Sequence, residues 1–174
     1  MSEQAGRYQR SAAGMIGAML VLLFVVVGFV LLREVNRSDP EAPGEPVDYQ
    51  QTADFARDQA DFAILAPPEL PDGWRATSVE FVPEPARWHL GLLTDEGEYV
   101  GLEQAESAVK SMVTTYVDSD PSRGEAVTID AQSWSSWTDE GGDTALVRTD
   151  GEAVTLVVGP VERGLLVDYV RSLR

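Results

Sequence analysis

The chain has 174 residues, no cysteine, one histidine, and 29 acidic residues against 13 basic ones, giving a net charge of −16 at pH 7. The missing cysteines exclude disulfides, thiolate catalysis and zinc–thiolate sites. One histidine excludes a multi-histidine zinc site. The strong negative charge disfavours binding to the phosphate backbone of nucleic acids. We therefore expect no nucleic acid partner, and the composition indicates no cofactor.

Residues 11–32 contain no charged side chain. As a helix they would extend roughly 33 Å, enough to cross a hydrocarbon core of about 30 Å. The run ends in Val30-Leu31-Leu32 without the small residues that a signal-peptide cleavage site requires. A buried core helix would be amphipathic or capped, whereas this run is apolar on every face. The segment is predicted to be an uncleaved, single transmembrane helix.

The flanking basic residues alone do not determine which end of this helix is cytoplasmic, because their number is the same on both sides. Arg7 and Arg10 precede it, and Arg33 and Arg37 follow it. A short head of residues 1–10 favours a cytoplasmic N-terminus, and a long following domain can be translocated largely regardless of its charge. We expect a single-pass protein of the cell membrane with its C-terminal domain outside.

Small residues within the span permit close packing of two such helices. They occur at a spacing of four, Ala13 with Gly17 and Gly14 with Ala18. This spacing is also ordinary in membrane helices, so self-association of the span is only one of two interpretations.

Residues 33–48 are predicted to form a tether, because the stretch SDPEAPGEPVD is rich in proline and acidic residues. The remaining residues 49–174 suit one domain with one core. Because only Glu3, Arg7 and Arg10 precede the span, the part after it carries 28 acidic and 11 basic residues, a net charge of −17. Such a charge also disfavours lying flat on anionic lipid.

The first half of this domain is predicted to contain a helix, a strand and a hairpin. A weak helical stripe of Phe55, Ala56, Ala60 and Ala63 follows Thr52, and residues 75–82 alternate as a strand that prolines then end. Residues 87–103 are predicted to form a hairpin around the loop 95–97, with a left-handed glycine in that loop.

The register of this hairpin predicts one core face and one polar face. Leu90 pairs with Leu102 and Leu92 with Val100 on the core face. His89 pairs with Glu103, Gly91 with Gly101, and Leu93 with Tyr99 on the other face. The facing glycines predict a shallow notch, either covered by one of the domain's own helices or open to a partner. His89, Gly91, Tyr99 and Gly101 form the candidate partner notch.

The second half is predicted to contain two helices and more antiparallel strands. The spacing of apolar residues predicts a helix over 105–116, strands near 126–129 and 132–137, a hairpin over 144–158 and a final helix after Gly159-Pro160. A two-residue loop at Asp150-Gly151 would pair Val147 with Val154. The final helix would bury a stripe at Val161, Leu165, Leu166, Tyr169, Val170 and Leu173. The sum is an α+β fold, a mostly antiparallel sheet with two or three helices packed on one face.

One short pattern suggests catalysis. Ser107 and Lys110 match the S-x-x-K arrangement of penicillin-recognising enzymes, in which the lysine helps to activate the serine. Lys110 is the only lysine, so the accompanying K-T-G motif is impossible, and the helical stripe places both residues on the solvent face. A hydrolase using Ser107 and Lys110 is therefore the weakest of the functional hypotheses.

Other patterns favour structural interpretations. A serine–histidine–acid triad would have to use His89, but no G-x-S-x-G motif supplies a nucleophile, and the pairing with Glu103 explains the histidine. The loop 118–124 departs from the calcium-loop pattern in its glycine and final ligand positions. The acidic loop 139–143 reads as a solvated turn, so we expect no metal site. Trp134 and Trp137 are three residues apart, which places them on opposite faces of a strand.

The stretches LPDGWRATSVEF, WHLGLLTDEGEYVGLEQ and ALVRTDGEAVTLVVG, together with the W-x-x-W pair, resemble an uncharacterised actinobacterial family of single-span membrane proteins containing a domain of unknown function. The resemblance implies an extracytoplasmic location and supplies no catalytic residues. The closing hairpin and helix are also similar to the end of some extracytoplasmic sensor domains of anti-sigma systems.

These observations favour a non-catalytic binding or accessory module of the cell envelope, with a protein, lipid or glycan partner. The alternative is the outer sensor domain of an envelope-stress or anti-sigma-type system. The ten residues before the span are too few for a cytoplasmic effector domain, so a sensor would need a partner protein to carry its signal.

Overall fold

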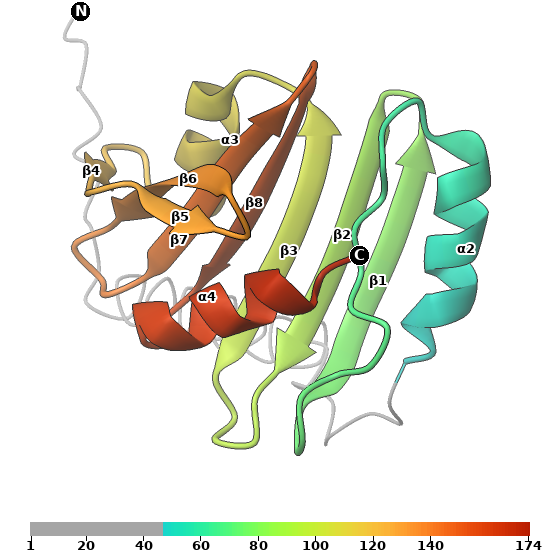
Figure 1. Cartoon of the computed structure of the whole chain (residues 1–174), viewed down its shortest axis with the longest axis horizontal. Coiled ribbons are helices and arrows are strands. Elements are labelled where there is room, and N and C mark those ends of the chain that lie inside the picture. Colours follow the sequence, from blue (N-terminus) through green and yellow to red (C-terminus); the bar gives the residue numbers. More distant parts are fainter. Residues whose placement is uncertain (1–46) are drawn as a thin grey trace, which may run out of the picture. The chain divides into compact units, whose positions relative to one another are not determined.

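The computed structural model describes residues 47–174 (Figure 1). The predicted head, transmembrane helix and most of the tether lie outside the described residues. Within residues 47–174, no helix combines the length and the apolar character needed to cross a membrane. Two residues of the predicted tether belong to the folded part. The backbone N–H of Val47 donates to the carbonyl of Ala76, at 3.2 Å, and Asp48 caps the first described helix.

Eight strands and three helices make up the described part of the chain. The strands are β1 (Arg75–Pro83), β2 (Ala86–Leu93), β3 (Tyr99–Glu106), β4 (Ser122–Arg123), β5 (Val127–Ile129), β6 (Gln132–Thr138), β7 (Thr144–Asp150) and β8 (Ala153–Gly159). The helices are α2 (Tyr49–Gln59), α3 (Val109–Tyr116) and α4 (Arg163–Ser172). The sheet has the order β1-β2-β3-β8-β7-β6-β4, and β5 pairs with β6. Every pairing is antiparallel, which confirms the predicted α+β class.

The β2–β3 hairpin has the predicted register. Leu90 pairs with Leu102 and Leu92 with Val100, and all four side chains are fully buried. Gly97 has a φ of +82° in the loop, a value that favours glycine. Because successive strand residues point to opposite faces, the predicted polar pairs lie together on the other side of this hairpin.

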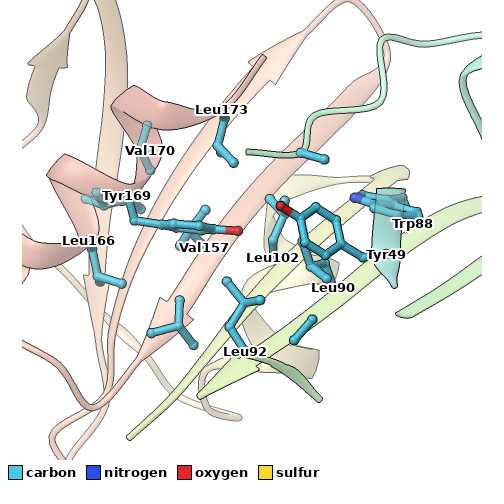
Figure 2. Packing of buried hydrophobic residues seen from close by; sticks show 14 of the residues in the cluster. Tyr49, Trp88, Leu90, Leu92, Leu102, Val157, Leu166, Tyr169, Val170 and Leu173 are labelled. Atoms are coloured by element: carbon cyan, nitrogen blue, oxygen red, sulfur yellow. The ribbon is translucent and has the colours of Figure 1, made fainter. Parts of the chain in front are cut away.

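One face of the sheet packs against α2 and α4. The Asp48 carboxylate accepts a hydrogen bond from the backbone N–H of Gln50, at 3.1 Å, and so begins α2. In Figure 1, α4 crosses in front of the sheet and α2 flanks β1. Figure 2 shows the core between these helices and the sheet. Its buried side chains come from α2 (Tyr49), from α4 (Leu166, Tyr169 and Val170) and from strands β2, β3 and β8 (Trp88, Leu90, Leu92, Leu102 and Val157).

Both predicted helical stripes need correction. The helix α2 begins at Tyr49 and not after Thr52, and it ends at Gln59, so Ala63 is exposed and lies beyond it. Phe55 is 57% exposed and Leu165 is 39% exposed, although both were expected to face the core. The buried residues of α2 are Tyr49, Ala53 and Ala56. Phe55 instead lies across the α2–β1 edge, where its ring meets the ring of Phe81 in a T-shaped pair at 6.2 Å.

The third helix lies on the opposite face, so the prediction that all helices share one face is wrong. Met112 and Val113 of α3 pack with Val154 and Leu156 of β8 in a second buried cluster. The predicted helix over 105–116 is also too long at its start, because Ala105 belongs to β3. The last residue of α3, Tyr116, lies near Glu103 on the polar face of β3.

The β7–β8 hairpin differs from the prediction by two residues. Val147 pairs with Leu156, and Asp150 pairs with Ala153. The two-residue loop is therefore formed by Gly151 and Glu152. Gly151 has a φ of +61°, which places glycine at the first central position of the turn. Because the shift is an even number, each side chain keeps its predicted face.

Candidate functional site

A hydrogen-bonded chain of three side chains occupies the β1–β3 part of the sheet face that carries α3. Ser78 Oγ lies 2.8 Å from His89 Nε2, and His89 Nδ1 lies 2.6 Å from Glu103 Oε1. The side chain of His89 is 27% exposed, whereas that of Glu103 is only 7% exposed. The sequence predicts the His89–Glu103 pair from the hairpin register. It does not predict Ser78.

A β-bulge in β1 brings Ser78 to this face. Ala76 pairs with Leu92, and Ser78 pairs with the next residue along β2, Gly91, so Thr77 is the extra residue. The Thr77 hydroxyl donates to the carbonyl of Gly91 at 3.2 Å. Without the bulge, Ser78 would share the buried face of Ala76, because residues two apart share a face.

The sequence contains an indication of this bulge. The apolar alternation of β1 passes from an even position, Ala76, to odd positions, Val79 and Phe81. A regular strand cannot place all three on one face, because its side chains alternate with a period of two. A change of phase within a strand is what one extra residue produces. This change in the apolar alternation of β1 is therefore the sequence signal that places Ser78 on the same face as His89.

The ring of Tyr99 covers the two facing glycines. A Cβ atom on Gly91 would lie 3.1 Å from Cε2 of Tyr99, and a Cβ on Gly101 would lie 3.3 Å from Cε1. The two edges of one ring therefore rest over different glycines. Tyr99 remains 42% exposed. The notch is therefore neither empty nor filled by a helix. The side chain of Tyr99, which pairs with Leu93 in the ladder, fills it.

The environment of His89 favours the imidazolium form. The hydrogen bond to Glu103 raises the pKa of His89 above its usual value of 6.5, and partial burial opposes this shift without cancelling it. When His89 is protonated, both ring nitrogens donate, so Ser78 Oγ accepts from Nε2 and its own hydroxyl hydrogen can donate to the Tyr99 oxygen. When His89 is neutral with its hydrogen on Nδ1, Nε2 accepts from Ser78 instead. Protonation therefore reverses the direction of the Ser78 hydrogen bond.

Two tyrosines border the Glu103 carboxylate. Burial and, next, the charge of Glu103 raise the pKa of both Tyr99 and Tyr116. Both phenols therefore stay neutral at physiological pH and keep their O–H donors. The result is a surface with one exposed aromatic ring and several hydroxyl and imidazole groups that can both donate and accept.

The two short distances match the relay of a serine hydrolase, in which histidine removes the serine proton and an acid orients the histidine. That chemistry also needs donors aimed at a developing oxyanion. Ser78 lies within a strand paired to β2, and not at a strand-to-helix turn that would offer such donors.

The structure does not join the other predicted catalytic pair. Ser107 lies in the connection that precedes α3, and Lys110 is exposed on its first turn. No hydrogen bond links them in the described part of the chain.

The acidic loop is a turn, as predicted. Asp139 Oδ1 accepts backbone hydrogen bonds from Gly142 and Asp143, at 2.7 and 2.6 Å. Among residues 47–174, no group of three or more histidine or acidic side chains is arranged to hold a metal ion. The two tryptophans of β6 lie on opposite faces, which confirms that prediction. Trp134 is buried in the core shared with α4, and Trp137 packs against the cluster of α3.

A family model described as "Protein of unknown function (DUF4245)" matches residues 7–173. The chain belongs to this family. The match spans nearly the whole sequence, including the segments outside the described residues. It confirms the resemblance to a family of unknown function, and DUF4245 brings no assigned site residues. No curated protein matches the chain.

Proposed function

We propose that this member of the DUF4245 family is a non-catalytic binding module of the cell envelope, and that it binds a neutral glycan on the face around Tyr99. In this proposal the segment 11–32 anchors the chain in the cell membrane, and the folded domain lies outside. The observation that carries the proposal is the Tyr99 ring, which rests on two glycines and leaves much of its surface exposed.

An exposed aromatic ring supported from below suits a sugar. The ring is amphipathic and rigid, so it offers contact area at a low cost in conformational entropy. The C–H face of a pyranose packs against such a ring. Gly91 and Gly101 allow the ring to lie close to the backbone, which fixes its orientation before a ligand arrives.

The groups beside the ring match the hydroxyl groups of a sugar. Ser78, His89 and Tyr116 supply donors and acceptors within the same face, and Glu80 is exposed next to His89 in the β1–β2 ladder. Sugar hydroxyls both donate and accept, so they can pair with each of these groups.

The charge of the chain favours a neutral glycan. The part after the predicted span carries a net charge of −17. This field repels polyphosphates and other polyanions, whereas it leaves a neutral sugar unaffected. The same argument disfavours an anionic lipid surface as the partner.

Binding is tested with the full-length chain in detergent, titrated with oligomers of N-acetylglucosamine and of mannose and followed by calorimetry. We expect Tyr99→Ala to weaken binding at least about tenfold, the equivalent of about 1.4 kcal/mol. Tyr99→Phe should retain most of the affinity, because the ring is preserved. Phe55→Ala is the matched control, since Phe55 is the other strongly exposed aromatic side chain among the described residues.

Equal binding by the parent and Tyr99→Ala would refute the glycan site. If neither sugar series binds, and a protein copurifies with the parent chain but not with Tyr99→Ala, the binding face stands and the glycan is wrong. The anchor is tested separately, by adding protease to intact spheroplasts. Removal of residues 47–174 supports the outside location, and protection until the membrane is broken contradicts it.

A further inference from the structure

A groove of about 480 Å³ lies along strands β6 and β7, on the sheet face that carries α3. Among the described residues, no acidic one lines this groove, although the chain has 29 acidic and 13 basic residues. The domain as a whole repels polyanions. A molecule with one negative charge is influenced mainly by the groups that it touches, because exposed charges farther than about 8 Å are largely screened at physiological ionic strength. The lining therefore favours a ligand with a single negative charge.

Arg123 of β4 is the cation of this groove. It pairs with Trp137 of β6, and its guanidinium carbon lies 5.6 Å from the centre of the Trp137 ring. This contact attracts the cation by its charge and uses none of its N–H donors. Arg123 is exposed, and the ion pairs among residues 47–174 give it no carboxylate partner. The other arginine at the groove, Arg148, places its guanidinium over Trp134, on the opposite face of the sheet. The donors of Arg123 can therefore take a carboxylate in two parallel hydrogen bonds.

The Trp137 ring beside this cation is held in one orientation. Its indole N–H donates to Ser135 Oγ at 3.1 Å, and the Ser135 hydroxyl donates to the carbonyl of Val147 at 3.2 Å. One part of the ring packs against the cluster of α3, and the residue as a whole is half-buried. The accessible part therefore offers rigid apolar surface to a ligand at little cost in conformational entropy.

The other end of the groove carries hydroxyl groups. Ser133 and Thr149 line it there, and both are exposed. Ser133 and Trp137 are four residues apart on β6, so they share a face and lie roughly 13 Å apart along the strand. Val109 of α3 adds apolar surface to the wall. A ligand that reaches both ends is therefore elongated, with a carboxylate at one end and hydroxyl groups at the other.

We propose that this groove binds a short acidic sugar, a unit of two rings with one uronic acid. The carboxylate pairs with Arg123, one ring packs beside Trp137, and hydroxyl groups of the second ring pair with Ser133 and Thr149. The groove is separate from the site at Tyr99, because α3 packs on β8, which lies between β3 and β7. The proposal does not require a ligand at Tyr99, and either site can fail alone.

The test uses the full-length, ¹⁵N-labelled chain in detergent and the indole N–H resonance of Trp137, assigned by its loss in Trp137→Phe. Cellobiouronate, a glucuronic acid joined to glucose, should shift this resonance with saturation. Cellobiose has the same two rings without the carboxylate and should bind at least about tenfold more weakly. Arg123→Lys keeps the charge but loses the planar fork, so it should also weaken cellobiouronate binding at least about tenfold. Arg171→Lys is the matched control, because Arg171 is an exposed arginine of α4 that pairs with Asp168 outside the groove.

A second pair of variants tests the hydroxyl end of the groove. Thr149→Val keeps the shape of the side chain and removes its hydroxyl, so it should weaken cellobiouronate binding severalfold, whereas Thr149→Ser should retain it. Tyr99→Ala should leave this affinity unchanged.

Urea unfolding provides a check that the variants fold. Because Arg123 is exposed, Arg123→Lys should have nearly the parent midpoint without ligand. Cellobiouronate should raise the midpoint of the parent chain and of Arg171→Lys more than that of Arg123→Lys. Absence of binding, equal binding of cellobiose or acetate, unchanged affinity in Arg123→Lys, or loss of binding in Tyr99→Ala would each overturn the proposal.

Discussion

Gly91 and Gly101 face each other in the β2–β3 ladder, yet the structure predicts very different results when each becomes alanine. A Cβ on Gly91 would collide with Ser78 Oγ and would lie 2.9 Å from the Tyr99 hydroxyl. Contacts this short cannot persist, so Ser78 must rotate and Tyr99 must tilt. Gly91→Ala therefore breaks the Ser78–His89 hydrogen bond as well as displacing the ring.

The magnitude follows from three contributions. A hydrogen bond to a charged group contributes about 1.5 to 3 kcal/mol, and the lower end applies because His89 and Ser78 are partly accessible to water. Tilting the Tyr99 ring loses roughly 0.5 to 1 kcal/mol of packing. Replacing a strand glycine by alanine returns about 0.5 to 1 kcal/mol through chain entropy. We expect Gly91→Ala to lower the free energy of unfolding by about 1 to 2 kcal/mol.

Gly101→Ala is the matched control. Its Cβ would meet Tyr99 Cε1 at 3.3 Å and Glu103 Oε1 at 3.6 Å, distances that require only small adjustments. The entropy gain of about 0.5 to 1 kcal/mol should then roughly cancel the crowding. We expect a change within about 0.5 kcal/mol.

The assay is urea unfolding of the full-length chain in detergent, followed by near-ultraviolet circular dichroism. Ser78→Ala removes the atom that Gly91→Ala would strike, so the double variant should be more stable than the two single changes predict. Equal destabilisation at Gly91 and Gly101 would refute the asymmetry. Strict additivity with Ser78→Ala would show that the serine does not occupy the space above Gly91.

Two further predictions concern charge and the S-x-x-K pair. Because the folded-state pKa of His89 is raised, protonated His89 stabilises the fold fully below about pH 6.5, and this stabilisation is lost as the pH rises through the raised value. Glu103→Gln should lower the imidazole pKa measured by NMR and should make the free energy of unfolding depend less on pH in this range. Ser107→Ala and Lys110→Ala should each change the free energy of unfolding by less than about 0.5 kcal/mol, and labelling of Ser107 by a β-lactam or fluorophosphonate probe would contradict this.

The β2–β3 hairpin could be predicted from the sequence in detail because three local features agree. Gly97 fixes the loop, the strands alternate with a period of two, and the apolar pairs all fall on one face. Any shift by one residue would expose Leu90 and its neighbours, so the register is strongly determined. The His89–Glu103 pair follows from this register and needs no tertiary information.

The less accurate predictions concern features that local patterns do not determine. The predicted β7–β8 register differs from the observed one by two residues. Both possible two-residue loops contain Gly151, and both registers keep the same side chains on the apolar face, so the sequence does not distinguish them. The position of α3 on the opposite face also escaped prediction. Residues 153–159 of β8 are buried on both faces, and a continuous apolar strand does not indicate which helix covers which side.

The candidate site depends on one irregularity of the sheet, the bulge at Thr77, which a regular strand pattern does not predict. The adjacent row of the ladder, on the opposite face, pairs Leu90 with Leu102 in the core, whereas His89 and Glu103 form a polar pair. A buried ion pair adds little net stability compared with well-packed apolar residues. The bulge at Thr77 weakens the ladder locally and has the effect of turning one hydroxyl toward an imidazole. Our proposal that this face binds a polar ligand accounts for the polar cluster, for the strand irregularity that completes it and for the exposed ring beside it.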